Sequence, residues 1–189
     1  MSPCVRGWGF THGTPCCPPG VIFAAAMRGK GKGRWSAAAL AHMTQSNGPA
    51  AEILRGHGVT AMSDVTGFGL LGHLAEILRP SGCGARLQLD RVPAMEGAAE
   101  LLAEGLQSSL QEQNARAAAV VRDADRVAQR PGWGLLLDPQ TSGGLVATLP
   151  LDQADDCIRS LHQAGYTDAA VIGAVVAEHE VSPQLVAVE

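Results

Sequence analysis

The spacing of hydrophobic residues predicts helices and strands that alternate along the chain. Leucine and isoleucine recur at positions 70, 71, 74, 77 and 78, which places them on one face of an amphipathic helix that Pro80 and Gly82 end. Shorter helical patterns cover residues 35–43, 50–55, 95–104, 111–129 and 151–164. Strands are predicted at residues 21–24, 86–90, 134–137, 145–149 and 169–176.

The apolar run at residues 169–176 is typical of a strand that is buried on both faces. Together with the alternation of elements it predicts an α/β (α+β) fold, with a mixed β-sheet flanked by helices. Residues 1–20 are crowded with Pro, Gly and Cys without a period, so we expect them to be disordered. The domain is then expected over residues 21–178, and residues 179–189 either add an edge strand or fray.

Composition narrows the class of protein. With 189 residues, 46% of them apolar and 17% charged, the chain can form one domain with a buried core. Its apolar runs are too short to span a bilayer, so no membrane partner is expected. Aromatic residues make up only 4%, which argues against a base-stacking nucleic-acid surface. The odd number of cysteines, five, without metal-ligand spacing or a secretory leader, favours the cytoplasm.

Charge is distributed unevenly along the chain. Residues 1–51 carry five basic side chains and no acidic one, whereas all eighteen acidic residues follow. Four of the basic residues alternate with glycine in one short segment, at Arg28, Lys30, Lys32 and Arg34. This segment either meets an anionic ligand or forms a solvated loop, and the spacing does not decide between the two.

The first candidate site is the segment at residues 63–70, directly before the amphipathic helix. A helix N-terminus favours phosphate, and Gly67 and Gly69 let the backbone approach a ligand closely. Thr66 either caps the helix or donates to an oxyanion. Asp64 is a candidate ligand for Mg²⁺ bound to the same phosphates. The alternative is an ordinary helix start, with Asp64 compensating the helix dipole.

The second candidate site lies in the turn at residues 138–144, between two predicted strands. It offers the hydroxyls of Thr141 and Ser142 and the paired glycines Gly143 and Gly144. These residues can form an anion nest, but the segment taken by itself favours the simpler interpretation, a tight connection between strands. The two common nucleotide-binding motifs, G-x-x-x-x-G-K-[ST] and G-x-G-x-x-G, do not occur. The histidines lack metal-ligand spacing, and the position of His73 beside the apolar helix face predicts a packing residue.

The two candidate sites together resemble a known family. The motif DVTGFGLLGHL (residues 64–74), followed by DPQTSGGL (residues 138–145), resembles motifs of selenophosphate synthetase, which is also called selenide, water dikinase. This family belongs to the aminoimidazole ribonucleotide synthetase superfamily. The resemblance covers roughly residues 20–178. It implies an enzyme that converts ATP, selenide and water to selenophosphate, AMP and phosphate, with two α/β domains and a homodimer.

The resemblance also assigns roles to individual residues. Asp64 resembles the carboxylate that this half of the family contributes to the magnesium–phosphate cluster. Thr66, Gly67 and Gly69 would line the same ATP phosphates. The loop of Thr141, Ser142, Gly143 and Gly144 is similar to the family's second glycine loop.

The chain departs from the family in one respect. The N-terminal domain of the family, with its reactive Cys or selenocysteine, catalytic Lys, aspartates and ATP loop, has no counterpart here. We therefore do not assign a catalytic residue, and Cys16 and Cys17 lie outside the context of that motif.

The expected function is that of a C-terminal domain that is inactive alone. One alternative is an accessory or dimerisation domain that complements a separate ATP-binding chain. Another is a relative acting on a purine or thiamine precursor.

Overall fold

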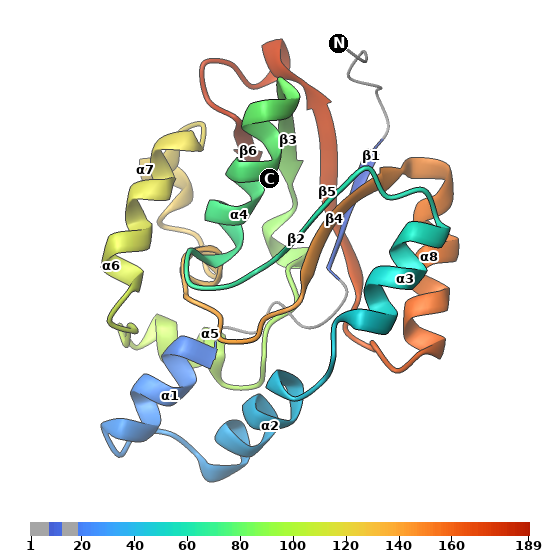
Figure 1. Cartoon of the computed structure of the whole chain (residues 1–189). Coiled ribbons are helices and arrows are strands. Elements are labelled where there is room, and N and C mark those ends of the chain that lie inside the picture. The colour runs from blue at the N-terminus through green and yellow to red at the C-terminus, as the bar shows by residue number, and fades with distance from the viewer. Residues whose placement is uncertain (1–7, 13–18) are drawn as a thin grey trace.

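The computed structural model describes residues 8–12 and 19–189 of the chain (Figure 1). Within these residues a six-stranded sheet has the order β2-β4-β1-β5-β3-β6. Its neighbouring strands are antiparallel except β3 and β6, which are parallel. The strands are β1 (Trp8–His12), β2 (Ala61–Asp64), β3 (Cys83–Leu87), β4 (Leu145–Pro150), β5 (Ala170–Ala177) and β6 (Val186–Val188). Helices flank this sheet, which confirms the predicted fold class.

The described helices are short, and each is too short or too polar to cross a bilayer. The α-helices are α1 (Pro19–Met27), α2 (Gly33–Met43), α3 (Gly48–Gly56), α4 (Gly69–Ser81), α5 (Ala98–Ala103), α6 (Gln111–Asn114), α7 (Ala124–Val127) and α8 (Leu151–Gln163). The described residues also include four 3-10 turns between these elements, η1 (Leu89–Arg91), η2 (Ala115–Val120), η3 (Trp133–Leu136) and η4 (Glu178–Glu180).

Two hydrophobic clusters cover the two faces of the sheet. In strand β4, Leu145 and Leu149 point to the cluster formed with α3 and α8, whereas Val146 points to the cluster formed with α4. Figure 1 shows α3 and α8 on one side of the sheet and α4 on the other. Because neighbouring side chains of a strand point to opposite faces, a strand buried on both faces needs a continuous apolar run.

The amphipathic pattern at residues 70–78 forms helix α4, as predicted. Leu70, Leu71 and Leu74 are fully buried against the sheet. The helix ends at Gly82, whose left-handed φ of 58° is a conformation that glycine adopts without strain. Burial of this leucine face fixes α4, and with it the segment that precedes it.

The strand predicted at residues 21–24 is wrong, since these residues belong to helix α1. Val21 and Ile22 are fully buried, together with Trp35 of α2 and Leu101 of α5, in a third cluster below the sheet. A short apolar run does not distinguish a strand from a buried helical turn, and the alanines that follow favour the helix.

Two further predictions in the middle of the chain are corrected. Residues 134–137 were expected to form a strand, but residues 134–136 lie in the 3-10 turn η3 and Leu137 directly follows it; η3 itself follows Gly132, which has a left-handed φ of 87°. The helix expected over residues 111–129 is divided into α6, η2 and α7. Asp123 interrupts it with a φ of 53°, which a continuing helix does not allow.

The sheet contains one strand from the segment that the sequence predicted to be disordered. Residues 8–12 form β1 between β4 and β5, with Trp8 opposite both Pro150 and Val175. The expectation of disorder is therefore wrong for these five residues and for Pro19 and Gly20, which begin α1, whereas residues 1–7 and 13–18 lie outside the described part of the chain. Trp, Phe and Thr are strand formers, but their signal is hidden among the Pro, Gly and Cys around them.

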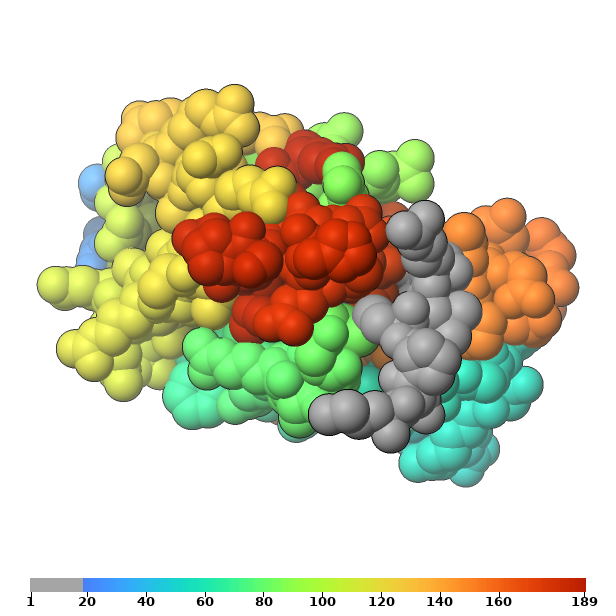
Figure 2. Space-filling model, turned by 90° about the horizontal axis from the view of Figure 1, so that it is seen from above, coloured from blue at the N-terminus to red at the C-terminus, as the bar shows by residue number. Residues whose placement is uncertain are grey.

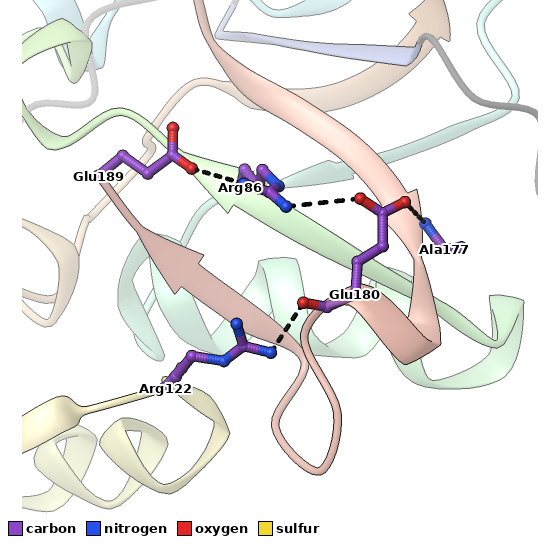
Figure 3. Close-up of polar contacts among 5 residues, drawn as sticks. All are labelled: Arg86, Arg122, Ala177, Glu180 and Glu189. Carbon is purple, nitrogen blue, oxygen red and sulfur yellow. Dashed lines mark hydrogen bonds and ion pairs between the residues drawn. The ribbon is translucent and has the colours of Figure 1, made fainter.

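The tail after β5 returns to the sheet as the edge strand β6. Arg86 of β3 binds Glu189 at 3.0 Å and Glu180 at 3.5 Å, and Arg122 donates to the Glu180 carbonyl at 2.7 Å (Figure 3). The carboxylate of Glu180 also accepts from the N–H of Ala177 at 3.3 Å. Figure 2 shows the C-terminal residues in red beside the yellow residues around α7. The tail thus adds an edge strand.

Candidate functional site

The structure brings the two candidate glycine segments side by side at one end of the sheet. The first, residues 63–70, runs from the end of β2 to the start of α4, and the second, residues 138–144, directly precedes β4. The N–H of Val65 donates to the Gly144 carbonyl at 2.8 Å. The N–H of Gln140 donates to the Thr66 carbonyl at 2.9 Å. The two segments are therefore one structural unit, joined through their backbones.

Two asparagine side chains hold this unit in place, and the sequence analysis did not identify either. The Nδ2 group of the buried Asn114 donates to the carbonyls of Gly67 at 2.8 Å and Leu137 at 2.9 Å. The Nδ2 group of Asn47 donates to the Gly143 carbonyl at 2.9 Å. Asn114 is the last residue of α6 and Asn47 directly precedes α3. Neither position gives a local signal of these contacts, which follow only from the tertiary arrangement.

The glycines in the two segments serve different purposes. A Cβ atom on Gly143 would lie 2.2 Å from the Val65 carbonyl oxygen, and one on Gly69 would lie 2.9 Å from the Leu136 carbonyl oxygen. Gly69 also has a left-handed φ of 69°. At Gly67, by contrast, a Cβ would meet no atom within 4 Å. Close packing therefore explains Gly69 and Gly143, and of these three glycines only Gly67 faces open space.

The hydroxyl of Thr66 is held by a buried histidine. Thr66 Oγ1 lies 3.1 Å from His73 Nε2, and His73 Nδ1 lies 3.0 Å from Glu76 Oε2. Helix α4 has no side-chain cap, so the capping role considered for Thr66 is wrong. His73 is 6% exposed and has a hydrogen-bond partner at each ring nitrogen, which confirms that it is a packed histidine.

The hydroxyl residues of the second segment lie on the surface. Thr141 and Ser142 are exposed, and Ser142 adopts a φ of 51°. Gly143 and Gly144 behind them are buried. The segment is therefore a tight connection with two accessible hydroxyls at its outer side.

Asp64 is the last residue of β2 and an exposed residue of the first segment. Its backbone pairs with Leu145, whereas its carboxylate makes no hydrogen bond or ion pair with any described residue. Within residues 8–12 and 19–189, no group of three or more His, Cys, Asp or Glu side chains is placed to hold a metal ion. The first glycine segment thus offers one accessible carboxylate, that of Asp64, which fits a Mg²⁺ ion whose other ligands are phosphate and water oxygens.

Asp138, the first residue of the second segment, is fully buried and cannot reach a ligand. Its Oδ2 atom accepts a hydrogen bond from the N–H of Val21 at 2.9 Å, at the start of helix α1. Burial raises the pKa of this carboxyl group to about 6, because it disfavours the charged form, although the N–H groups of Val21 and Gly20 partly offset this. Asp138 therefore links α1 to the second glycine segment.

The basic residues between α1 and α2 are exposed, and two of them are already paired. Arg34 binds Glu96, and this contact lowers the pKa of the Glu96 carboxyl group. Lys32 lies 3.8 Å from Glu100, and its ammonium group is 4.3 Å from the centre of the Trp35 ring. Arg28 and Lys30 remain available, so this segment offers less positive charge than its sequence indicates.

A pocket of about 530 Å³ lies near the glycine unit. It is enclosed by α5, α6 and residues 128–134, and its wall includes Trp133, Gln111 and Leu137. Neither Asp64 nor any other residue of the first glycine segment lines it. It is therefore separate from the candidate phosphate site.

Comparison with known protein families assigns the chain to one of them. The family described as AIR synthase related protein, C-terminal domain, matches residues 21–186. The chain belongs to this family. Both glycine segments of this AIR synthase-related domain lie inside the matched region, whereas β1 lies before it.

Curated relatives of this AIR synthase-related domain are selenide, water dikinases. That of Pelobacter propionicus is 35% identical over 159 residues, which cover 84% of this chain and 46% of the relative. That of Burkholderia ambifaria is 37% identical over 161 residues, which cover 83% of this chain and 44% of the relative. The chain therefore spans about half the length of the curated relatives that it matches.

Solved structures agree on the fold of the AIR synthase-related domain. The hydrogenase maturation protein HypE in complex with ATP matches with a TM-score of 0.64 and 17% identity, over 98% of this chain and 48% of that one. The thiamine monophosphate kinase of Aquifex aeolicus matches with a TM-score of 0.59 and 12% identity, over 98% of this chain and 51% of that one. At these identities the likeness concerns the fold alone.

Proposed function

We propose that this chain acts as the C-terminal half of a selenide, water dikinase, in which ATP, selenide and water yield selenophosphate, AMP and phosphate. The observation that carries the proposal is the contact between the two glycine segments, with Asp64 exposed at their edge. These segments also carry the resemblance to the family. The identity of 35–37% to two selenide, water dikinases supports the same assignment.

In this proposal the chain binds the phosphate end of ATP. Asp64 would hold Mg²⁺, which neutralises phosphate charge during phosphoryl transfer. Gly67 leaves room for a phosphate group to approach the backbone before α4, where the positive end of the helix dipole lies. Thr66 and Gly69 shape this segment, and Gly143 and Gly144 hold the exposed hydroxyls of Thr141 and Ser142 beside it. Positioning and charge neutralisation are the main demands of this chemistry.

The chain alone is expected to be inactive, because it lacks the reactive Cys, catalytic Lys and ATP loop of the family's N-terminal domain. It requires that half from another polypeptide or another part of a longer chain. An accessory domain that complements a separate ATP-binding chain is the second candidate. The match to only about half of the curated relatives' length supports this candidate equally well. The resemblance further implies a cytoplasmic location and a homodimer, and analytical ultracentrifugation of the purified chain would test the homodimer.

Complementation tests this proposal directly. The chain is mixed with the N-terminal half of the Pelobacter propionicus enzyme, and selenide-dependent formation of AMP is measured. The relative's own C-terminal half serves as the positive control and shows that the fragment is competent. We expect AMP from the mixture and none from either part alone. AMP formation by the isolated chain, or no gain in a mixture whose positive control works, would contradict the proposal.

A further inference from the structure

Thr66, His73 and Glu76 form a continuous chain of hydrogen bonds behind the first glycine segment. Thr66 Oγ1 is 3.1 Å from His73 Nε2, and His73 Nδ1 is 3.0 Å from Glu76 Oε2. His73 is nearly fully buried, and the ring of Phe68 lies 5.7 Å from its own ring, centre to centre. Glu76 reaches it from the next turn of α4, with more than half of its side chain exposed.

The chemistry of the three groups determines where the protons lie. An ionised carboxylate has no proton to donate, so Glu76 accepts from His73 and the ring carries its proton on Nδ1. In a neutral ring the Nε2 atom then has a lone pair and can only accept. The partner of Nε2 is the Thr66 hydroxyl, which must therefore donate its proton inward, to the histidine.

We propose that His73, fixed by Glu76, is a positioning residue that turns the proton of Thr66 away from the ligand. Thr66 then presents oxygen lone pairs to the site and accepts a hydrogen bond from its ligand. The group that it faces is a hydrogen-bond donor, such as the water shell of a divalent cation. A bare phosphate oxygen cannot fill this place, so phosphate contacts are left to the backbone.

This inference rests on the proposed phosphate site for the identity of the ligand, but the direction of the Thr66 hydroxyl does not. The earlier expectation that Thr66 donates to an oxyanion conflicts with this arrangement. Two experiments therefore address the two parts separately.

The first experiment measures the tautomer of His73 by nitrogen-detected NMR of the histidine rings in the full chain. At about pH 8, above the ordinary imidazole pKa of about 6.5, we expect the Nδ1–H form for His73. His162 is an internal control, because its Nε2 atom lies 2.8 Å from the Ala169 carbonyl, which can only accept. His162 should therefore show the opposite form, Nε2–H, in the same spectrum. An Nε2–H form for His73 overturns the proposal.

Variants of Glu76 test what fixes the ring. In Glu76→Ala the signal of His73 should shift toward the Nε2–H form, whereas Glu76→Gln keeps an acceptor oxygen and should retain Nδ1–H. Glu52→Ala, an exposed acid on α3, should leave the spectrum unchanged. A His73 tautomer that is identical in Glu76→Ala and in the unmodified chain shows that Glu76 does not fix the ring.

The second experiment measures binding of inorganic triphosphate by calorimetry, with Mg²⁺ and with a chelator. Thr66→Val should weaken the magnesium complex by about fivefold, the effect of one hydrogen bond, and leave metal-free triphosphate unchanged. Thr66→Ser should restore the affinity, which separates this effect from misfolding. Equal loss with and without Mg²⁺ would mean that Thr66 donates to phosphate and would overturn the proposal.

The outcomes distinguish the inference from the proposed function. If triphosphate does not bind the unmodified chain at all, the phosphate site of this chain is wrong, and the ring spectrum still decides the direction of the hydroxyl. If triphosphate binds but His73 is in the Nε2–H form, the phosphate site stands and the positioning role is wrong.

Discussion

Asp138 accepts a hydrogen bond from the backbone N–H of Val21, 117 positions earlier in the chain, at 2.9 Å. The N–H groups in the first turn of a helix have no acceptor within the helix. The carboxylate provides one for α1 and keeps this helix against the second glycine segment. This link makes a buried acidic group part of the framework of the candidate site.

The buried carboxyl group predicts a pH dependence of stability. Its pKa of about 6 lies above the value of about 3.9 in an unfolded chain. Between these values the folded state holds the proton more often than the unfolded state, so the free energy of unfolding decreases as the pH rises from 4 to 6. The total effect is about 3 kcal/mol. An asparagine at this position cannot titrate, so the variant Asp138→Asn should not show this decrease. Its free energy of unfolding minus that of the unmodified chain should therefore be larger at pH 8 than at pH 4, by about 3 kcal/mol.

Urea unfolding at the two pH values measures this difference. Asp64→Asn is the matched control, because Asp64 is exposed and makes no ion pair with a described residue. If Asp138→Asn and the unmodified chain show parallel pH profiles, the carboxyl group of Asp138 does not titrate as proposed.

A pair of glycine substitutions separates packing from ligand access. In Gly143→Ala the new methyl group would lie 2.2 Å from the Val65 carbonyl oxygen, so the two glycine segments must move apart. We expect a loss of about 2 kcal/mol or more in the free energy of unfolding. Gly67→Ala meets no atom within 4 Å and should change stability by less than about 0.5 kcal/mol. Similar losses in the two variants would contradict the assigned roles.

Gly67→Ala should nevertheless affect ligand binding. If a phosphate group approaches the backbone at Gly67, the added methyl group weakens triphosphate binding while the thermal unfolding curve stays unchanged. Unaltered binding would place the phosphate elsewhere.

Asp64 should contribute to activity and not to stability. Its carboxylate is exposed and without a described partner, so Asp64→Asn should change the free energy of unfolding by less than about 0.5 kcal/mol. In the complementation assay we expect at least a roughly tenfold loss of magnesium-dependent AMP formation, because a charged magnesium ligand is removed. Glu52→Gln on α3 is a control with equal loss of charge. Full activity in Asp64→Asn would remove Asp64 from the metal site.

Strand β1 should be required for folding. It forms ladders with both β4 and β5, so its removal leaves two facing strand edges without partners. Deletion of residues 1–12 should abolish cooperative thermal unfolding, followed by circular dichroism. Gly9→Pro removes one N–H from the middle of the strand and should be strongly destabilising, whereas Gly9→Ala keeps it. A deletion variant that melts like the unmodified chain would contradict this prediction.

The sequence predicted the elements whose pattern is long and regular. Helix α4 and strand β5 have enough periodic or apolar positions to be recognised without a structure. The helix α1 was missed because four apolar residues fit either a strand or a buried turn. Strand β2 escaped for a related reason, since its four residues mix polar and apolar side chains with little burial.

The candidate site was predictable in its parts but not in its connections. The glycine segments and Asp64 stand out by residue type and position. Local sequence does not reveal that Asn114 joins Gly67 to Leu137, or that His73 holds Thr66. Nor does it reveal that residue 143 must be a glycine because the Val65 carbonyl leaves no room for a Cβ atom, rather than because a ligand does. These relationships depend on the packing of α4 and α6 against the second segment.

The position of β1 between β4 and β5 also has a kinetic consequence. Trp8 pairs with Pro150 and Val175, so the middle of the sheet joins residues from opposite ends of the chain. Contacts of such long sequence separation require large loops to close before they contribute stability, and they slow folding. On the ribosome the sheet cannot close until β5 has emerged, and until then the nascent chain exposes apolar strands that a chaperone would recognise.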